Sequence, residues 1–223
     1  MKIKNYTIYD RSMTKNWNKF RDSKEEKDYF IPLDKKDYLI KLNSYDPDKK
    51  VVNDFSDLVQ RGHIKKIVSF CSGSCNIEYY LMKKFNLICE VSDNTHSIER
   101  IKNFEIFHKV SFIDITKEFK IDVDNNTIVL LSRIDTEFED YQLQNFFSKM
   151  YSLKVKYIYF IPAEIFTLKT ILVKIKILIT CFLRFRRPVS WGYIRSFNGF
   201  NKLWRQYYET ISKTTNGLIL KIK

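Results

Sequence analysis

Glycine and proline are scarce: the chain of 223 residues contains 5 glycines and 4 prolines. Neither G-x-G-x-x-G nor Gly-Lys-Ser/Thr occurs, which excludes the glycine-rich turns that bind dinucleotide pyrophosphates or nucleoside triphosphates. A charge-free apolar run of about 20 residues, the length that a membrane-spanning helix needs, is also missing. A small ligand, if bound, must therefore be held by a turn that needs fewer glycines.

The few cysteines and histidines do not form metal-binding patterns. The 4 cysteines form no C-x-x-C pair, and the 3 histidines form no H-x-x-x-H or HExxH pattern. We therefore expect no metal site. Free thiols fit a reducing compartment, and residues 1–20 lack the apolar stretch of a secretion signal. The expected location is the cytoplasm.

Positive charge, in contrast, is abundant. Lysine and arginine total 39 against 26 acidic residues, which gives a formal net charge of +13. Such a field favours a polyanionic partner, a phosphorylated substrate or an anionic membrane surface, and it does not choose among them. An AT-rich genome, which enriches lysine, asparagine, isoleucine and tyrosine, is an alternative explanation for part of the charge.

The N-terminal quarter differs in pattern from the rest of the chain. Residues 1–60 alternate aromatic and charged side chains, and short helices are predicted around 14–31 and 50–60, with Pro32 and Pro47 as breakers. We interpret this part as a helical cap.

From residue 61 to residue 223, apolar runs alternate with amphipathic stretches. This pattern predicts βαβ units and a parallel sheet buried on both faces, in an α/β, Rossmann-like, doubly wound fold that binds ligands at the carboxyl ends of its strands. Strands are predicted at 64–70, 86–92, 109–114, 126–132 and 155–162, and helices at 76–85, 96–104, 140–151 and 200–208.

The first strand and turn, IVSFCSGSC (67–75), resemble the first motif of class I S-adenosylmethionine (SAM)-dependent methyltransferases. That motif reads hydrophobic-hydrophobic-acid-hydrophobic along the strand and continues as G-x-G-x-G. Gly73 falls at the central glycine, whereas Cys71 and Cys75 replace the outer glycines and Ser69 replaces the acid. The ordered series of later strands extends the resemblance over about residues 60–165.

The resemblance implies where SAM would bind. The second strand of the family ends in an acid that binds the ribose, which we assign to Asp93, and the third ends in an Asp that binds the adenine amine, which is Asp114 here. A helix N-cap for Asp93 and a strand-end turn for Asp114 are the alternatives. The implied cofactor-binding residues are Cys71, Ser72, Gly73, Ser74, Asp93, Asn94, Asp114, Ile115, Ser132 and Arg133.

Acceptor-side candidates follow the fourth and fifth strands. Asp135 is the first choice for a base that takes the proton of an acceptor hydroxyl, and Glu164 is the second. In the segment WGYIRS, Trp191, Tyr193 and Arg195 form a candidate acceptor wall, which we expect to share one cleft with the two acids. Helix capping for Asp135, an exposed turn for Glu164, and core packing with an ion pair for the third group are the alternatives.

The segment 167–187 is basic and amphipathic, within an insertion that we place at 167–196. On a helix, Lys169, Lys176, Thr180, Arg184 and Arg187 form one polar stripe beside a wide apolar surface, and Lys174 adds a further charge. Such a helix suits an anionic membrane interface, which would place the protein peripherally at the inner face of the membrane. It equally suits a lid packed over the sheet.

These features favour a SAM-dependent methyltransferase, similar to small bacterial enzymes of surface-polysaccharide biosynthesis. The preferred acceptor is a sugar hydroxyl or sugar-linked phosphate in a glycan or its lipid-linked precursor. RNA is a second acceptor class, although no RNA-binding module or NPPY-like motif occurs. A non-catalytic scaffold that keeps the fold without the cofactor is the third hypothesis.

Overall fold

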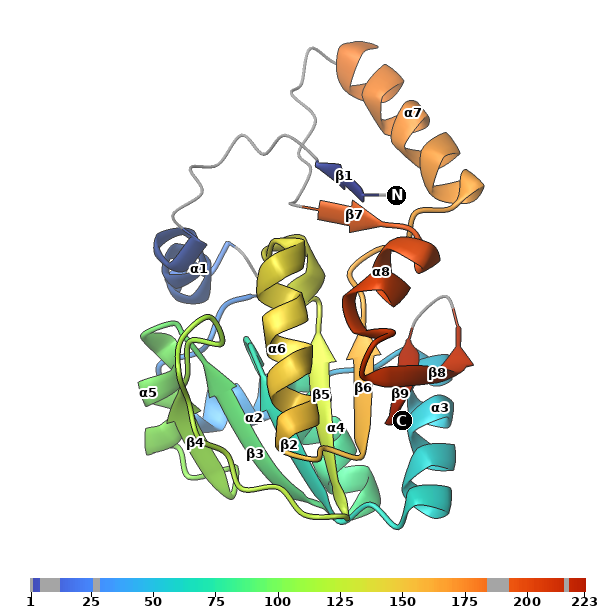
Figure 1. The fold of residues 1–223 in the computed structure, drawn as a ribbon. Helices are drawn as coiled ribbons and strands as arrows, with labels where there is room; N and C mark the ends of the chain where they lie inside the picture. The colour runs from blue at the N-terminus through green and yellow to red at the C-terminus, as the bar shows by residue number, and fades with distance from the viewer. Residues whose placement is uncertain (1, 5–12, 26–28, 184–192, 215–216) are drawn as a thin grey trace.

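A sheet of 7 strands in the order β4-β3-β2-β5-β6-β9-β8 forms the centre of the molecule in a computed structural model (Figure 1). The structure describes residues 2–4, 13–25, 29–183, 193–214 and 217–223. The strands are β2 (Lys66–Phe70), β3 (Ile88–Asp93), β4 (Lys109–Phe112), β5 (Thr127–Ser132), β6 (Tyr157–Ile161), β8 (Tyr208–Lys213) and β9 (Leu218–Ile222). Strands β2 to β6 are parallel, and β9 runs antiparallel between β6 and β8. The predicted α/β fold with a mostly parallel sheet is confirmed.

Both faces of the sheet are covered by helices. Successive side chains of a strand point to opposite faces, so one strand contributes to the apolar cluster on each side. On β2, Ile67 belongs to one buried apolar cluster and Val68 to the other. The first cluster includes side chains of α2 (Lys35–Asn43), α3 (Lys49–Gly62), α4 (Asn76–Phe85) and α5 (Ser97–Asn103). The second includes side chains of α6 (Asp140–Ser152) and α8 (Phe197–Trp204).

The N-terminal helices agree only in part with the prediction, since α3 corresponds to the helix expected over 50–60. The helix expected over 14–31 is shorter: α1 spans Met13–Asp22. The unpredicted α2 follows Pro32, and its N-cap Asp34 accepts hydrogen bonds from two backbone amides. Helix α1 is fixed to α5 because the Asn18 side chain accepts the His96 amide (3.0 Å) and Asp22 pairs with Arg100 (2.9 Å).

The C-terminal part also departs from the prediction. The helix expected over 200–208 ends at Trp204, and the chain continues as the β8–β9 hairpin. The inserted helix α7 spans Leu168–Leu183, within the predicted 167–187. It lies beyond the short pair of β1 (Lys2–Lys4) and β7 (Tyr193–Arg195), away from the sheet (Figure 1). Trp191, Arg184 and Arg187 lie outside the described residues.

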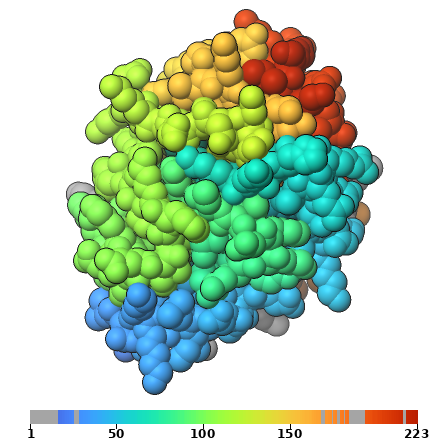
Figure 2. Space-filling model, turned by 90° about the horizontal axis from the view of Figure 1, so that it is seen from below, coloured from blue at the N-terminus to red at the C-terminus, as the bar shows by residue number. Residues whose placement is uncertain are grey.

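The strand order places a crevice between β2 and β5. The chain runs outward from β2 through β3 to β4 and returns to β5 on the other side of β2, so the loops after β2 and β5 diverge there. The opposite end of the molecule, seen from below in Figure 2, shows a continuous surface that the N-terminal, middle and C-terminal parts of the chain share. Because the strand order reverses between β2 and β5, we expect a ligand to bind at the carboxyl ends of these strands.

Candidate functional site

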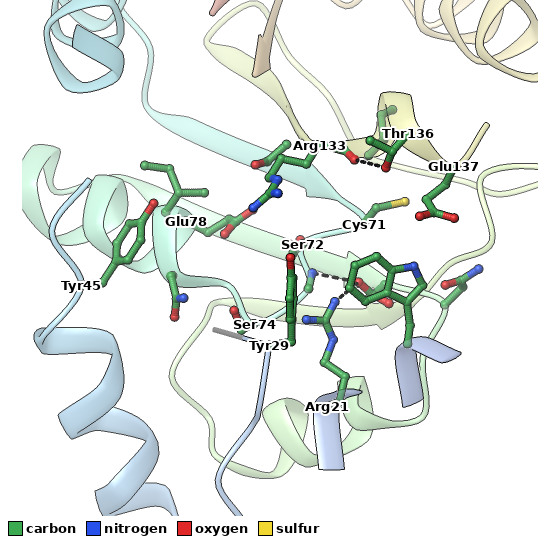
Figure 3. Close-up of a pocket in the computed structure, with 18 of the residues that line it drawn as sticks. Arg21, Tyr29, Tyr45, Cys71, Ser72, Ser74, Glu78, Arg133, Thr136 and Glu137 are labelled. Atoms are coloured by element: carbon green, nitrogen blue, oxygen red, sulfur yellow. Dashed lines mark hydrogen bonds and ion pairs between the residues drawn. The ribbon is translucent and has the colours of Figure 1, made fainter. Parts of the chain in front are cut away.

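A cavity of about 540 Å³ lies at that crevice. This volume is within the range of small-molecule sites. Its wall comes from the turn after β2, the end of β3, the loop after β5, and the N-terminal segment that contains α1 and the residues after α2. Figure 3 shows Arg21 and Tyr29 approaching the turn from the N-terminal segment, with Arg133, Thr136 and Glu137 on the opposite wall. Four parts of the chain that are distant in sequence thus share one site.

The turn after β2 has a left-handed backbone at three positions, two of which carry residues that disfavour this conformation. Cys71, Gly73 and Cys75 all have positive φ, at 54°, 61° and 57°. A non-glycine residue in this left-handed region costs roughly 1–2 kcal/mol. The alternating positions at which G-x-G-x-G turns carry glycine therefore keep the left-handed backbone here, with cysteine at the outer two. The replaced glycines do not remove the turn.

Asp93 joins this turn to the end of β3. Its Oδ2 accepts the Gly73 amide at 2.8 Å, and its Oδ1 accepts the Thr95 amide at 3.0 Å. The Arg21 guanidinium approaches Oδ2 at 3.9 Å, and both side chains are buried. Asp93 thus fixes the turn before α5, but the helix N-cap is His96, so the N-cap alternative for Asp93 is wrong; Asp93 also lines the cavity. The two roles coexist because a carboxylate has about four lone-pair directions.

The N-terminal segment forms a wall that the sequence pattern did not indicate. Arg21 lies over the Trp17 ring at 5.3 Å from its centroid, and Trp17 meets Tyr29 edge-on at 5.2 Å. The Ile31 amide donates to the Arg21 carbonyl at 2.8 Å, which folds the chain back onto α1. As a result, a cation and two aromatic rings face the glycine turn.

Glu78 is the most deeply buried acid of the cavity. It lies in the first turn of α4, is 0% exposed, and its Oε1 accepts the Ser69 hydroxyl at 2.7 Å. Burial raises the pKa of Glu78 to about 7, against the opposing effect of the Ser69 hydrogen bond. Within the described residues, its Oε2 has no hydrogen-bond partner, and the same is true of Asn76 Oδ1 and Arg21 Nε. All three atoms belong to residues that line the cavity.

Most of the predicted cofactor residues are brought together. Among them the cavity wall contains Cys71, Ser72, Gly73, Ser74, Asp93, Asn94, Ser132 and Arg133. Asp114 and Ile115 lie elsewhere in the described structure. Asp114 accepts the Thr116 amide (3.0 Å) and pairs with Lys117, and Ile115 is buried in the apolar core. The turn role that was the alternative for Asp114 is what the structure shows.

The expected acceptor cleft is wrong. Among the described residues that line the cavity, none is Asp135, Glu164, Tyr193 or Arg195. Arg195 is 0% exposed and donates to Asp140 (2.9 Å), to the Phe138 carbonyl (2.7 Å) and to the Asp135 carbonyl. Arg195 therefore stabilises the loop after β5 and does not line the cavity.

The remaining acceptor candidates surround this arginine or the loop after β6. The Asp135 carboxylate accepts the Ala163 amide at 2.9 Å, and burial raises the pKa of Asp135 to about 6. Tyr193 donates to Glu139, and Glu164 is half-buried beside Ile165. Arg195 therefore forms an ion pair, as its alternative interpretation proposed. The Asp135 side chain is buried against the Ala163 amide instead of facing the cavity.

Sequence reasoning missed much of the wall. The missed residues that line the cavity are Trp17, Arg21, Tyr29, Lys41, Ser44, Tyr45, Asp46, Asn76, Ile77, Glu78, Ile134, Thr136, Glu137 and Phe138. A signal existed for Glu78: the first strand lacks the acid of the motif, and a glutamate follows in the first turn of the next helix, α4. No local signal marked Arg21, because only tertiary packing brings α1 to the turn.

No protein-family model matches the sequence, and no curated protein sequence matches it significantly. Solved structures do match. Human N-acetylserotonin methyltransferase in complex with SAM has a TM-score of 0.56 at 14% identity over 78% of this chain and 51% of that one. The SAM-dependent methyltransferase SibL, in its apo form, has a TM-score of 0.53 at 12% identity, over 83% of this chain and 61% of that one.

A third match covers nearly all of both chains. Magnesium protoporphyrin IX methyltransferase from Synechocystis PCC 6803 with bound S-adenosylhomocysteine (SAH) has a TM-score of 0.54 at 10% identity, over 95% and 98%. This chain spans about half the length of the human enzyme and about three fifths of SibL. At these identities the likeness establishes the architecture: the chain has the fold of SAM-dependent methyltransferases.

Proposed function

We propose that this protein is a SAM-dependent methyltransferase. The observation that carries the proposal is the cavity at the carboxyl ends of β2, β3 and β5, where the left-handed turn and Asp93 meet in a methyltransferase fold. Two neighbours of this fold, the human enzyme and the Synechocystis enzyme, hold SAM and SAH, respectively. The two cysteines that replace glycines of the motif do not argue against this proposal, because the turn keeps positive φ at all three positions.

The polar groups of the cavity fit the cofactor. SAM has a zwitterionic amino-acid end, a sulfonium, a ribose diol and an adenine ring. The unpaired acceptors Asn76 Oδ1 and Glu78 Oε2 suit an ammonium, and the unpaired donor Arg21 Nε suits a carboxylate. Asp93 keeps lone pairs for ribose hydroxyls, and the Trp17 and Tyr29 rings offer apolar surface to a base.

The chain would contribute positioning and proton transfer. When bound, SAM supplies a methyl group activated by the sulfonium, and transfer to a nucleophile depends mainly on in-line placement. A hydroxyl acceptor must also lose its proton, to which a positioned base contributes about a hundredfold or more. Glu137 lines the cavity two residues after the buried Asp135, and we infer that it replaces Asp135 as the candidate base.

For the acceptor we propose a hydroxyl or sugar-linked phosphate of a glycan or its lipid-linked precursor. Two neighbours are named after small molecules, N-acetylserotonin and magnesium protoporphyrin IX, which favours a small acceptor over RNA. Incubation with methyl-labelled SAM and separate lipid, glycan and RNA fractions tests this choice. Label in the lipid or glycan fraction supports it, whereas label in RNA alone would replace it.

Calorimetry tests the cofactor proposal directly. We expect SAM and SAH to bind with micromolar affinity, which corresponds to about 8 kcal/mol. Absence of heat and of a thermal shift with both ligands would contradict the enzyme hypothesis and leave the non-catalytic scaffold.

We also propose that α7 binds an anionic membrane surface. Among the described side chains of α7, six apolar ones are exposed, and five of them recur at helical spacing on one side: Leu172, Ile175, Ile179, Phe182 and Leu183. Lys176 is exposed at the edge of this stripe, and the whole chain carries a charge of +13. An apolar stripe flanked by positive charge suits the headgroup region of a bilayer. The side chains of Lys169 and Lys174, like residues Arg184 and Arg187, are outside the described set.

Within the described residues, no helix is long and apolar enough to cross a membrane, so contact through α7 would be at the surface. Flotation with vesicles rich in phosphatidylserine tests the proposal: the wild type should float at low salt and less at high salt. The variant Ile175→Asp, Ile179→Asp should remain at the bottom. Leu33→Asp, which changes an exposed leucine outside α7, is the matched control. Equal flotation of both variants would overturn the proposal, and a stable dimer that α7 substitutions dissociate would indicate a second copy instead.

A further inference from the structure

Glu78 is a buried acid with one satisfied oxygen and one unsatisfied oxygen. Oε1 accepts the Ser69 hydroxyl, whereas Oε2 has no partner within the described residues. A buried carboxylate oxygen without a donor is costly, so such groups are usually explained by a ligand, a water or an ion. Glu78 lines the cavity, which gives a ligand access to that oxygen.

The position of Glu78 explains the departure at Ser69. The first strand of methyltransferases carries an acid where this chain has Ser69, and Ser69 itself is 0% exposed. The Ser69 hydroxyl contacts the Glu78 carboxylate at 2.7 Å, so the two side chains together occupy the region that a longer acid on the strand would reach. The carboxylate is present, but it comes from the helix.

A second acceptor lies in the same helical turn. Asn76 Oδ1 is buried and has no partner within the described residues, and Asn76 also lines the cavity. An ammonium offers three N–H donors and no acceptor, which matches two acceptor atoms that lack donors. A hydroxyl offers only one donor. A cation with several N–H groups is the ligand chemistry that these atoms fit.

We propose that Glu78 binds the α-ammonium of the amino-acid end of SAM and SAH, supplying from α4 the carboxylate that Ser69 does not provide. This inference rests on the proposed function, because it names the part of the cofactor that Glu78 holds. Glu78 acts as a binding residue, since neither SAH nor the ammonium takes part in bond making.

The pH dependence follows from the burial of Glu78. The groups that act on its charge are Asp93 from β3 and Arg21 from α1. Nearby Cys75, Cys89, Tyr38 and Tyr45 have pKa values that burial raises above their ordinary ranges, so they stay neutral at neutral pH. Below its pKa of about 7 the Glu78 carboxyl is protonated and offers the ammonium no charge. Affinity should therefore rise with pH through about 7, and binding should release a proton.

The test compares ligands with and without the amino-acid end. Glu78→Gln keeps the size of the side chain and an acceptor for Ser69, and it removes the charge. Loss of a charged hydrogen bond of roughly 1.5–3 kcal/mol predicts about 10- to 100-fold weaker binding of both SAM and SAH. Binding of 5′-methylthioadenosine, which lacks the amino-acid end, should be unchanged. The matched control Glu99→Gln, at an exposed acid of α5, should bind all three like the wild type.

Two further measurements separate binding from a structural role. Calorimetry of SAH in buffers of different ionisation enthalpy should show proton release at about pH 6.5 in the wild type and none in Glu78→Gln. Moving the carboxylate back to the strand, in Ser69→Asp, Glu78→Ala, should recover affinity that Glu78→Ala loses. The inference would be overturned if the wild type bound SAH and Glu78→Gln bound it with the same affinity. It would also be overturned if Glu78→Gln lost as much affinity for 5′-methylthioadenosine as for SAH. A wild type that binds neither SAM nor SAH would contradict the proposed function itself.

Discussion

Replacing Gly73 with valine is expected to abolish detectable binding of SAM and SAH while the protein remains folded. Gly73 has a φ of 61°, and a Cβ there would lie 2.7 Å from Arg21 Nη2 and 3.1 Å from Nη1. The side chain would displace the guanidinium from Asp93 and fill the cavity beside the turn. Strain of roughly 1–2 kcal/mol at the left-handed position is small compared with the stability of a typical domain. We expect at least a hundredfold loss of affinity, measured by calorimetry.

Cys71→Gly is the matched control for this variant. It changes a second residue of the same turn, also at positive φ (54°), in the direction that relieves strain. It should bind SAH at least as well as the wild type and keep the same far-ultraviolet circular dichroism. If Gly73→Val bound SAH normally, the turn after β2 would not be part of the cofactor site.

Replacing Arg195 with alanine is expected to lower the free energy of unfolding by about 3 kcal/mol. The change leaves the carbonyl groups of Asp135 and Phe138 without their buried donor and removes the ion pair with Asp140. The loop after β5 should loosen, so affinity for SAH should fall as well. Urea unfolding followed by tryptophan fluorescence measures the change, since Trp204 is in the buried cluster that contains α8.

Arg205→Ala provides the comparison, because Arg205 is exposed at the end of α8. It should change stability by less than about 0.5 kcal/mol. Unchanged stability of Arg195→Ala together with selective loss of acceptor binding would restore the interpretation of Arg195 as part of an acceptor wall.

The site shows which inferences a single sequence supports. Gly73 and Asp93 were predictable because each follows a buried strand, and carboxyl ends of parallel strands meet at one edge of a sheet. Asp135 was predicted by the same rule but failed, since its side chain turns to the Ala163 amide instead of the cavity. Strand ends fix the positions of backbone segments, and the packing around them fixes side-chain directions.

Regular local patterns by themselves determined the five parallel strands, the helices between them and the edge of the sheet at which the site lies. Strand and helix periodicities report burial along one element, which is why the first strand, its glycine turn and the helix from residue 76 were found. Tertiary structure alone decided that Arg21 and Trp17 close the cavity, that Glu78 turns inward to Ser69, and that Arg195 is buried under the loop after β5. These contacts join residues far apart in the chain, or select one side-chain direction among several, and both depend on the balance of burial and hydrogen bonding in the whole folded molecule.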